Sequence, residues 1–397
     1  MNHLDRRGFL HAAGLTSIAS SLPSAVVAQA ASSQAGSSNA KHEVVPPDAR
    51  SQQKPKHHIK FAVIGLDHYH IMSMTAAVIR GGGEVVAVCS TNADGLKDKQ
   101  LADFRQKFGD VKIASSEDEI LNDKSIALIA GAPIPDQRAP LGMRVMKAGK
   151  DYLSDKPALT TLEQLSEVRK VITETRRKFA IMYSERLEVP AAVKAGELVK
   201  SGAIGKVIQT VNLAPHMINN TTRPAWFFDK HRYGGILADI GSHQADQFLY
   251  YTDSSTAQVV ASQSGNIMHP QYPMFEDFGD MMLSGNGGTG YIRVDWFTPD
   301  GLGTWGDGRL FILGSDGYIE LRKYVDVANK QGGNHLFIVD KKEARYIDCN
   351  NVYLPFGEQF VADIINRTEV AQNQEQALLA AELVLTAQKN ATRPVIG

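Results

Sequence analysis

Between residue 58 and about residue 185, short apolar runs alternate with amphipathic segments. The apolar runs read IKFAVIG, EVVAVCS, SIALIAGA, DYLSDK and KFAIMYS. Most are continuous and rich in Val, Ile and Ala, which is typical of strands buried on both faces of a parallel sheet. The segments between them predict helices over 70–80, 94–108, 136–148 and 162–177. Strands that alternate with helices imply right-handed crossovers, so this part of the chain predicts a doubly wound parallel sheet of the Rossmann type.

Beyond residue 185 the alternation gives way to a succession of strands. A helix is predicted over 191–201, and a second helix opens near residue 239. Strand-like segments then follow one another, and the glycine-containing turns 285–288 and 315–317 join them as hairpins. This pattern predicts a C-terminal α+β domain with a largely antiparallel open sheet, and EQALLAAELVLTAQ predicts a closing amphipathic helix.

The first 57 residues differ in kind from the rest. Arg6 and Arg7 precede a weakly hydrophobic stretch, and Ala28-Gln29-Ala30 supplies an A-x-A cleavage pattern. Residues 1–30 therefore predict an export signal of the twin-arginine type and a periplasmic protein. The stretch is too short and too polar to be a permanent membrane span. Residues 31–57 are rich in Ser, Ala, Gln and Pro without periodicity, which predicts a disordered tether.

Composition narrows the class of protein. The chain has 397 residues, enough for two domains, which we expect at 58–185 and 186–397. Its net charge is −1 and its basic residues are scattered, so no nucleic-acid or anionic-membrane partner is expected. Of the two cysteines, Cys89 lies in the apolar run EVVAVCS and is expected to be a small buried side chain.

The first predicted strand ends in FAVIGLDHYHI, which opens like a dinucleotide-binding turn. Gly65 stands at the first glycine of G-x-G-x-x-G, but Asp67 and His70 replace the second and third. Asp67 brings a carboxylate to the phosphate site unless it turns away to cap the following helix. With Gly65 and Asp67, His68 and His70 are expected in the cofactor-binding loop. They are also candidate ligands for a metal or a sugar, or else they cap and pack the helix start. No acidic third ligand is evident, so no metal site is expected.

Other strand ends complete the expected cofactor site. Ser90 and Thr91 follow the second strand, where an acidic residue would bind the ribose 2′-hydroxyl of NAD. Their presence favours NADP, or the loss of a dinucleotide altogether. Pro133 follows a later strand, at the edge where ligands of doubly wound sheets bind. We expect NADP or NAD to be retained, because Gly65 and the following helix N-terminus still supply N–H donors.

Two stretches carry candidate catalytic groups. In SDKP, Pro157 favours extended geometry at Lys156, whose ammonium then leaves a strand at the cofactor edge and can polarise an oxygen. In GGILADIGSHQAD, Asp239 and His243 are four residues apart, so both project from one face of a helix. A carboxylate beside an imidazole is the usual equipment for orienting a base. The structural alternatives are a solvent-exposed lysine, a helix cap and a core histidine.

Taken together, Gly65, the D-K-P stretch and G-G-x-L-x-D-x-G-x-H-x-x-D resemble the Gfo/Idh/MocA-type oxidoreductases, over nearly all of the chain after the tether. The resemblance implies a Rossmann domain joined to an open-sheet domain that supplies substrate contacts and often an oligomer interface. It implies a nicotinamide cofactor, redox chemistry at a carbon of a sugar or cyclitol, and a homo-oligomer. Lys156 matches the lysine of the family's E-K-P, with Asp155 in place of Glu, and Asp239 and His243 match its catalytic Asp and His.

In that interpretation His243 is the base for the hydroxyl proton, Asp239 orients it, and Lys156 stabilises the alkoxide oxygen. Four side chains are candidate linings for a polyol site, where a tryptophan can stack on a sugar face: Glu185, His216, Arg223 and Trp226. The broken glycine fingerprint keeps a second class open. That class is a cofactor-independent carbohydrate lyase or hydrolase, or a sugar-binding protein, on the same fold.

Overall fold

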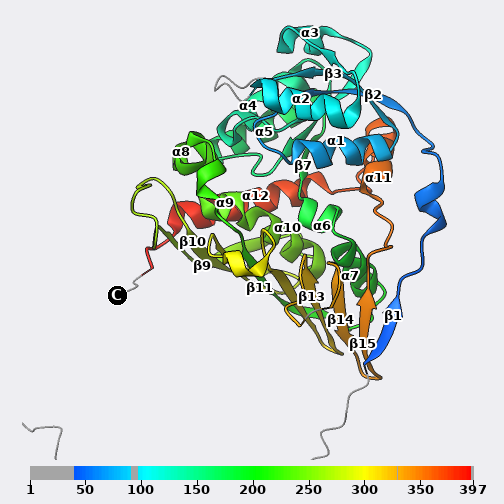
Figure 1. The fold of residues 1–397 in the computed structure, drawn as a ribbon, viewed down its shortest axis with the longest axis vertical. Coiled ribbons are helices and arrows are strands. Elements are labelled where there is room, and N and C mark those ends of the chain that lie inside the picture. Colours follow the sequence, from blue (N-terminus) through cyan, green and yellow to red (C-terminus); the bar gives the residue numbers. More distant parts are fainter. Residues whose placement is uncertain (1–39, 91–96, 329, 395–397) are drawn as a thin grey trace, which may run out of the picture. The chain divides into compact units, whose positions relative to one another are not determined.

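A six-stranded parallel sheet forms the first domain, in the order β4-β3-β2-β5-β6-β7 (Figure 1). The computed structural model describes residues 40–90, 97–328 and 330–394. The strands of this sheet are β2 (Ile59–Ile64), β3 (Gly83–Cys89), β4 (Lys112–Ile113), β5 (Ile126–Gly131), β6 (Asp151–Asp155) and β7 (Phe179–Met182). Its helices are α1 (Ile71–Arg80), α2 (Lys97–Phe108), α3 (Glu117–Asn122), α4 (Pro135–Lys147) and α5 (Leu162–Thr175). The predicted parallel sheet is confirmed, because every strand pair in it is parallel.

The strand order of this sheet reverses at β2. β2 pairs with β3 on one side and with β5 on the other, so the connections after β2 and β5 leave in different directions. Doubly wound sheets bind their ligands at such a point, outside the carboxyl ends of the strands. Gly65 follows β2 directly, and Pro133 lies two residues beyond β5. Gly65 and Pro133, two of the predicted cofactor residues, therefore lie at the point where the strand order reverses.

A nine-stranded mixed sheet forms the second domain, in the order β1-β15-β14-β13-β12-β8-β11-β10-β9. Its neighbours are antiparallel except for β8 with β11 and β1 with β15. The two predicted hairpins are confirmed, since β10 pairs with β11 and β12 with β13. The strands are β1 (Lys41–Val44), β8 (Val207–Pro215), β9 (Ala257–Gly265), β10 (Phe278–Gly285), β11 (Thr289–Asp295), β12 (Gly308–Gly314), β13 (Tyr318–Lys323), β14 (His335–Val339) and β15 (Ala344–Asp348).

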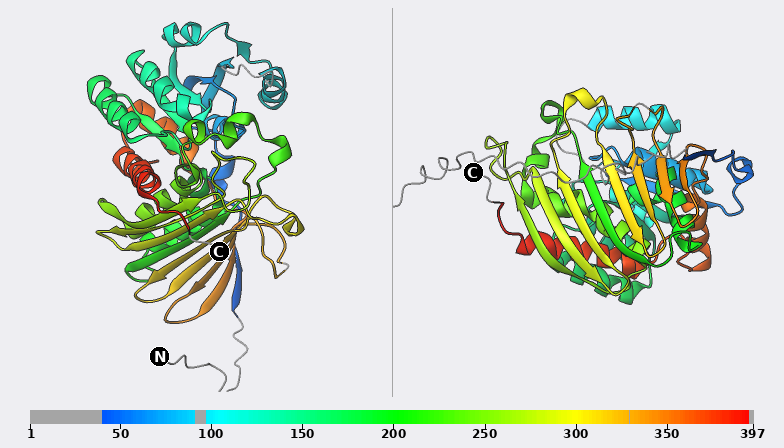
Figure 2. Two further views of the ribbon diagram at one scale, coloured as in Figure 1. Left: turned by 90° about the vertical axis from the view of Figure 1, so that its left-hand side faces the viewer. Right: turned by 90° about the horizontal axis from the view of Figure 1, so that it is seen from below.

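Helices α10 and α12 cover one face of this sheet, and the described residues place no α-helix on the other face (Figure 2). α12 also contacts α5 and β7, so it joins the cores of the two domains. The remaining helices are α6 (Ser184–Leu187), α7 (Pro190–Lys200), α8 (Lys230–Tyr233), α9 (Ile236–Asp239), α10 (Gly241–Thr252), α11 (Phe356–Asn366) and α12 (Gln374–Asn390). The short 3₁₀ helices are η1 (Ala49–Gln52), η2 (Asn220–Thr222), η3 (Ala225–Phe228) and η4 (Asp300–Leu302).

The predicted tether is wrong for residues 40–57. Lys41–Val44 form β1, which pairs in parallel with β15, and Ala49–Gln52 form η1. All four residues of β1 are exposed, so no alternation of polar and apolar positions marks this strand in the sequence. Its backbone instead pairs with the edge of the sheet. The unpaired N–H and C=O groups of an edge strand can pair with an added strand of almost any sequence. The predicted export signal and residues 31–39 lie outside the described residues.

The first domain also uses the end of the chain. Helix α11 packs on α1, and Phe356 and Phe360 share a hydrophobic cluster with Ile71 and Val78. The predicted division into 58–185 and 186–397 therefore misses a helix that returns to the first domain. An amphipathic pattern shows that a helix has a buried face, but it does not show which distant element covers that face.

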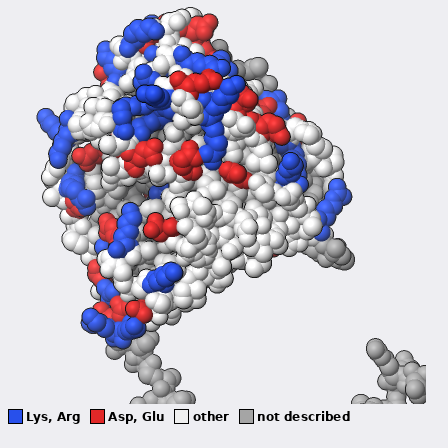
Figure 3. All heavy atoms as spheres, turned by 180° about the vertical axis from the view of Figure 1, so that it is seen from behind, with Lys and Arg blue, Asp and Glu red and all other residues white. Residues whose placement is uncertain are grey.

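The surface carries both signs of charge interspersed on the face shown in Figure 3. Among the described residues, no helix combines the length and the apolar character needed to cross a membrane. Cys89 is 7% exposed at the end of β3, which confirms its predicted burial.

Candidate active site

The loop after β2 is shaped around Gly65. Its φ of 84° lies in the left-handed region, and a Cβ there would come within 2.6 Å of the Pro133 nitrogen. Only glycine fits this position, so the first glycine of the fingerprint is retained for its backbone. The Gly65 N–H donates to the Cys89 carbonyl (2.9 Å) and the His68 N–H to the Ala132 carbonyl (3.1 Å).

Helix α1 begins at Ile71, its N-cap residue is His70, and the His70 side chain makes no capping hydrogen bond. Asp67 lies three residues before that position and is 8% exposed.

Asp155, at the end of β6, is the centre of the site. Its carboxylate is fully buried and accepts hydrogen bonds from His68 Nδ1 (2.6 Å), His70 Nδ1 (3.0 Å) and the Lys156 N–H (2.8 Å). The Arg138 guanidinium lies 3.0 Å away. Burial disfavours the charged carboxylate, but Arg138 and the two imidazoles outweigh burial and hold the pKa of Asp155 well below its ordinary value.

The two histidines are therefore fixed in one tautomer. An ionised carboxylate only accepts hydrogen bonds, so His68 and His70 each donate from Nδ1, and a neutral ring then carries its lone pair on Nε2. Their ring centroids lie 4.1 Å apart. Burial, followed by the neighbouring His70, lowers the pKa of His68 to about 3, so its ring is neutral at physiological pH.

Arg138 is a site residue that the sequence analysis missed. It lies in α4, is 1% exposed, and donates Nε to the Pro133 carbonyl (2.8 Å). It also donates Nη1 to the carbonyls of Lys156 and Pro157. One side chain thus ties both loops of the cofactor edge to Asp155. The segment PDQRAPLGM carries no signal for this, because a helical arginine is usually on the surface.

The structure brings Lys156 and Asp239 together. Lys156 is 4% exposed, and its Nζ lies 3.2 Å from Oδ1 of Asp239, the last residue of α9. Burial disfavours ionisation of Asp239, but Lys156 outweighs it, so the pKa of Asp239 is lowered. Asp239 was expected to orient His243, yet the hydrogen bonds of the described residues do not join them. An ammonium makes a stronger hydrogen bond to a carboxylate than a neutral imidazole does, which explains the exchange of partner.

His243 lies in α10 as a buried, neutral imidazole. It is 2% exposed, and its Nδ1 has no hydrogen-bond partner among the described residues. Its ring centroid is 6.5 Å from that of His70 and 6.2 Å from that of Tyr183. Burial lowers the pKa of His243 well below its ordinary value, so the ring is in the form that can accept a proton.

Two predicted lining residues lie close to these groups. Burial lowers the pKa of His216 to about 4, with Glu185, Lys156 and Asp239 also acting on its ring. Arg223 donates Nε to a backbone carbonyl, and its guanidinium lies over an aromatic ring at 4.4 Å. Burial lowers the pKa of Arg223, while Asp239 acts to raise it. The fold thus brings both basic side chains within electrostatic reach of Asp239.

Glu185 is held inside the protein. Its Oε2 accepts hydrogen bonds from Lys323 (2.6 Å), Gln244 (3.0 Å) and Gln247 (3.4 Å). Burial opposes ionisation, but Lys323 outweighs it and lowers the pKa of Glu185 below its ordinary value. The carboxylate that was expected to bind a sugar therefore anchors α6 and α10 to β13.

Trp226 packs against the hydrophobic core, although it was expected to line the site. Trp305 is the aromatic residue beside the site that the sequence analysis missed. It is 43% exposed, and its ring lies 4.7 Å from that of His216 and 4.4 Å from that of Tyr324. Its segment, GLGTWGDG, contains glycines and no regular pattern, so the sequence does not reveal what it faces.

The cofactor edge partly fits a dinucleotide. Ser90 follows β3, and its buried Oγ has no hydrogen-bond partner among the described residues. Such a hydroxyl suits a ribose oxygen or a 2′-phosphate, which lie at this strand end in Rossmann domains. Thr91, the other residue predicted here, lies outside the described residues.

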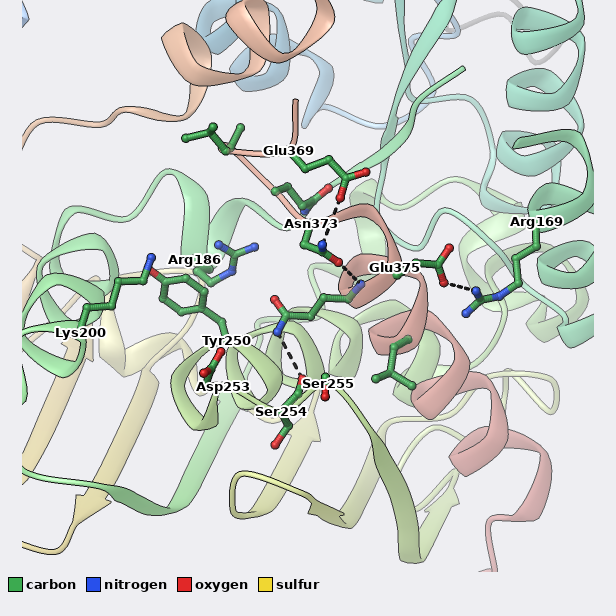
Figure 4. A pocket seen from close by; sticks show the side chains of 15 residues that line it. Arg169, Arg186, Lys200, Tyr250, Asp253, Ser254, Ser255, Glu369, Asn373 and Glu375 are labelled. Carbon is green, nitrogen blue, oxygen red and sulfur yellow. Dashed lines mark hydrogen bonds and ion pairs between the residues drawn. The ribbon is translucent and has the colours of Figure 1, made fainter. Parts of the chain in front are cut away.

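A separate cavity of about 540 Å³ lies away from these residues, where α12 begins and α10 ends (Figure 4). Its arginines are paired, Arg169 with Glu375 and Arg186 with Asp246. None of the predicted site residues lines this cavity. The candidate chemistry therefore belongs to the edge formed by β2, β5 and β6.

Both domains match models of one family. Residues 59–183 match the model of an oxidoreductase family with an NAD-binding Rossmann fold, and residues 192–320 match the GFO/IDH/MocA C-terminal domain. Among solved structures, a protein assigned as an oxidoreductase from Erwinia carotovora atroseptica is 46% identical, with a TM-score of 0.80. That alignment covers 85% of this chain and 100% of the other.

Curated relatives are more distant. D-xylose dehydrogenase of Paenarthrobacter nicotinovorans is 23% identical over 154 residues, which are 38% of this chain and 39% of the relative. 1,5-Anhydro-D-fructose reductase of Ensifer adhaerens is 26% identical over 192 residues, 47% of this chain and 54% of the relative. The chain thus spans about half the length of the curated relatives it matches, or less. With both domains matched in order along the sequence, the chain belongs to the Gfo/Idh/MocA family of oxidoreductases, and residues 59–183 form its NAD-binding domain.

Proposed function

We propose that the protein transfers hydride between a nicotinamide cofactor and a carbinol or keto carbon of a sugar or cyclitol. The observation that carries this proposal is the convergence of Lys156, Asp239 and a neutral, buried His243 beside the edge of the NAD-binding sheet. Oxidation of a carbinol needs a base for the hydroxyl proton and a cation for the developing alkoxide. His243 serves as that base, and Lys156 stabilises the oxygen.

Asp239 acts through Lys156 in this proposal. Its carboxylate holds the ammonium in place at 3.2 Å beside the substrate oxygen. A sugar as substrate is supported by the two relatives that are named as a sugar dehydrogenase and a sugar reductase. Trp305 and His216 give the site an aromatic wall, on which the apolar face of a sugar ring can stack.

The cofactor, which supplies the hydride acceptor or donor, is held by Gly65, Pro133 and Ser90 in this proposal. The hydroxyl at Ser90 replaces the acidic residue that repels a 2′-phosphate. We therefore propose NADP(H), or NAD(H) with little discrimination between the two.

Location and assembly also belong to the proposal. The twin-arginine pattern at Arg6 and Arg7 supports export to the periplasm. A homo-oligomer is supported by the open face of the nine-stranded sheet, where the register places a largely apolar row of side chains. That row consists of Met282, Tyr291, Val211, Phe311, Glu320 and Phe337. Met282 in this row is 49% exposed.

One observation favours a cofactor-independent carbohydrate lyase, hydrolase or binding protein. The N–H groups of Gly65 and His68 already donate to the carbonyls of Cys89 and Ala132, so these two do not serve a phosphate. Mass spectrometry of the gently denatured mature protein separates the two functions, because a bound dinucleotide appears at its own mass. Absorbance at 340 nm during incubation with aldoses, cyclitols and either NAD⁺ or NADP⁺ then tests the redox step. The proposed function would be contradicted if the protein carried no dinucleotide and reduced neither NAD⁺ nor NADP⁺ with any of these sugars.

A further inference from the structure

The cluster of His68, His70 and Asp155 takes no part in the redox chemistry proposed above. Ligand atoms of these three residues lie within 4.8 Å of one another. No metal site was expected from the sequence, because the histidine pair showed no acidic third partner. Strand β6 supplies that acidic partner as Asp155, 85 residues beyond His70. The reason for expecting no metal site therefore no longer holds.

Asp155 fits an orienting role better than direct coordination. Its two oxygens accept hydrogen bonds from His68, His70 and the Lys156 N–H at 2.6 to 3.0 Å, and the Arg138 guanidinium is an ion-pair partner at 3.0 Å. A carboxylate offers about four lone-pair sites, so these partners use most of its capacity. With Nδ1 of each ring on the carboxylate, Nε2 is the ring nitrogen left for an ion, and the two ring centroids lie 4.1 Å apart. Histidines that bind metals commonly donate their other ring N–H to a carboxylate in this way.

His243 provides an independent observation beside this pair. It is 2% exposed, its Nδ1 makes no hydrogen bond among the described residues, and its ring centroid lies 6.5 Å from that of His70. Buried polar atoms are nearly always hydrogen-bonded. A water or substrate hydroxyl carried by an ion on His70 can donate to this nitrogen.

The local charges and ligand types select the class of ion. Arg138 is paired with Asp155 and Lys156 with Asp239, so the two cations that face the cluster are each neutralised by a carboxylate. Neutral imidazole nitrogens suit zinc-class ions, whereas magnesium and calcium prefer oxygen ligands.

We propose that His68 and His70 bind one divalent transition-metal ion of the zinc class through their Nε2 atoms, with Asp155 as the positioning residue for both rings. The remaining coordination positions hold oxygen ligands, one of which faces His243. Catalytic zinc sites have three protein ligands and one open position, so two imidazoles leave this ion one position more open than those sites. The site does not depend on hydride transfer, and it can exist whether or not the protein uses a dinucleotide.

The test uses the mature full chain after treatment with a chelator. Titration with ZnCl₂ is followed by calorimetry, and titration with CoCl₂ by the visible absorbance of bound cobalt. We compare His68→Gln, His70→Gln and Asp155→Asn with His269→Gln as the control. His269 also places Nδ1 against a carboxylate, that of Asp277 at 2.7 Å, but it lies outside the cluster.

The wild type and the control should each bind one ion per chain with the same affinity. His68→Gln and His70→Gln should each weaken binding at least about tenfold, and Asp155→Asn by about 10- to 100-fold, the range found for partners of metal-bound histidines. Absence of binding by the wild type would overturn the proposal, as would full affinity in either histidine variant.

Two further measurements keep the result unambiguous. Zn²⁺ should slow the modification of His68 and His70 by diethyl pyrocarbonate in the wild type, as read by peptide mass spectrometry. This measurement needs only the wild type, so it remains informative if a variant does not fold. Equal modification with and without Zn²⁺ would contradict the site. Dinucleotide affinity measured on the same preparations reports on the proposed redox function separately.

Discussion

The ion pair between Lys156 and Asp239 allows a structural role to be separated from a catalytic one. Lys156→Met keeps the apolar stem and removes the ammonium, which leaves the Asp239 carboxylate without its nearest cation at 3.2 Å. Removing one partner of a buried pair costs about 3–5 kcal/mol. The Asp239 side chain is 14% exposed, and His68 and Arg138 also act on it. We therefore expect the lower end of this range, about 3 kcal/mol in the free energy of unfolding.

A second substitution removes the stranded charge. In Lys156→Met/Asp239→Asn no ionised group remains at the position, so we expect roughly 2 kcal/mol of the loss to return. Turnover should not return with it, because the cation that stabilises the substrate oxygen is still absent. Both variants should lose at least about a hundredfold in kcat/KM.

The assays are denaturant-induced unfolding and initial rates with the sugar and cofactor found by the absorbance screen. Lys150→Met is the matched control, because Lys150 is also a buried lysine beside β6 but donates to the Asp123 and Ile126 carbonyls. It should lower stability and leave the rate per folded molecule unchanged. Recovery of turnover together with stability in the double variant would refute the catalytic role of Lys156.

Acid unfolding gives an independent check on this pair. The pKa of Asp239 is lowered in the folded protein, with Lys156 outweighing burial. The folded state then binds fewer protons than the unfolded state, so the pair contributes stability above about pH 4. That contribution is lost as the pH falls through the lower, folded pKa. Lys156→Met should therefore flatten this acid-side slope, and an unchanged slope would show that the pair does not set the pKa.

Four other predictions address separate links of the argument. Changing both Arg6 and Arg7 to Lys should leave precursor in the cytoplasm, as read by fractionation and immunoblotting, and normal periplasmic accumulation would exclude twin-arginine export. His243→Ala should lower kcat at least about a hundredfold. Since burial holds the pKa of His243 well below its ordinary value, the wild-type rate should not fall through pH 6–7, and a titration there would exclude it as the base. Asp67→Gly should preserve or raise dinucleotide affinity in calorimetry by removing a charge from the phosphate loop, and weaker binding would argue against that placement. Phe311→Glu puts a charge in the middle of the open sheet face and should yield monomers in light scattering, whereas an unchanged mass would place the interface elsewhere.

Much of the fold could be predicted because local patterns carry it. The run FAVIG is apolar at every position, and in β2 only Lys60 of its six residues is exposed. The hairpin turns are marked by glycines that the backbone needs. The strand β1 and the packing partner of α11 could not be predicted, for different reasons. β1 is held by backbone hydrogen bonds and shows no side-chain pattern, while the partner of α11 lies far away along the chain.

Several individual site residues could be predicted from the sequence, but the contacts between their side chains could not. Lys156 and His243 were expected near one substrate oxygen with Asp239 orienting His243, and the structure instead brings Asp239 into contact with Lys156. Which partner a carboxylate takes depends on competition in space, and a lysine 83 residues away displaced the neighbouring His243. Arg138 illustrates the same limit, since its role consists of contacts with Asp155 and with carbonyls from two separate loops.

The two departures from the family pattern are physically one feature. Histidines occupy the glycine-rich turn at positions 68 and 70, and aspartate replaces glutamate before Lys156. The structure joins them, since both imidazoles donate to that aspartate at 2.6 and 3.0 Å. The two departures thus belong to one hydrogen-bonded group, which is the arrangement that the proposed metal site requires.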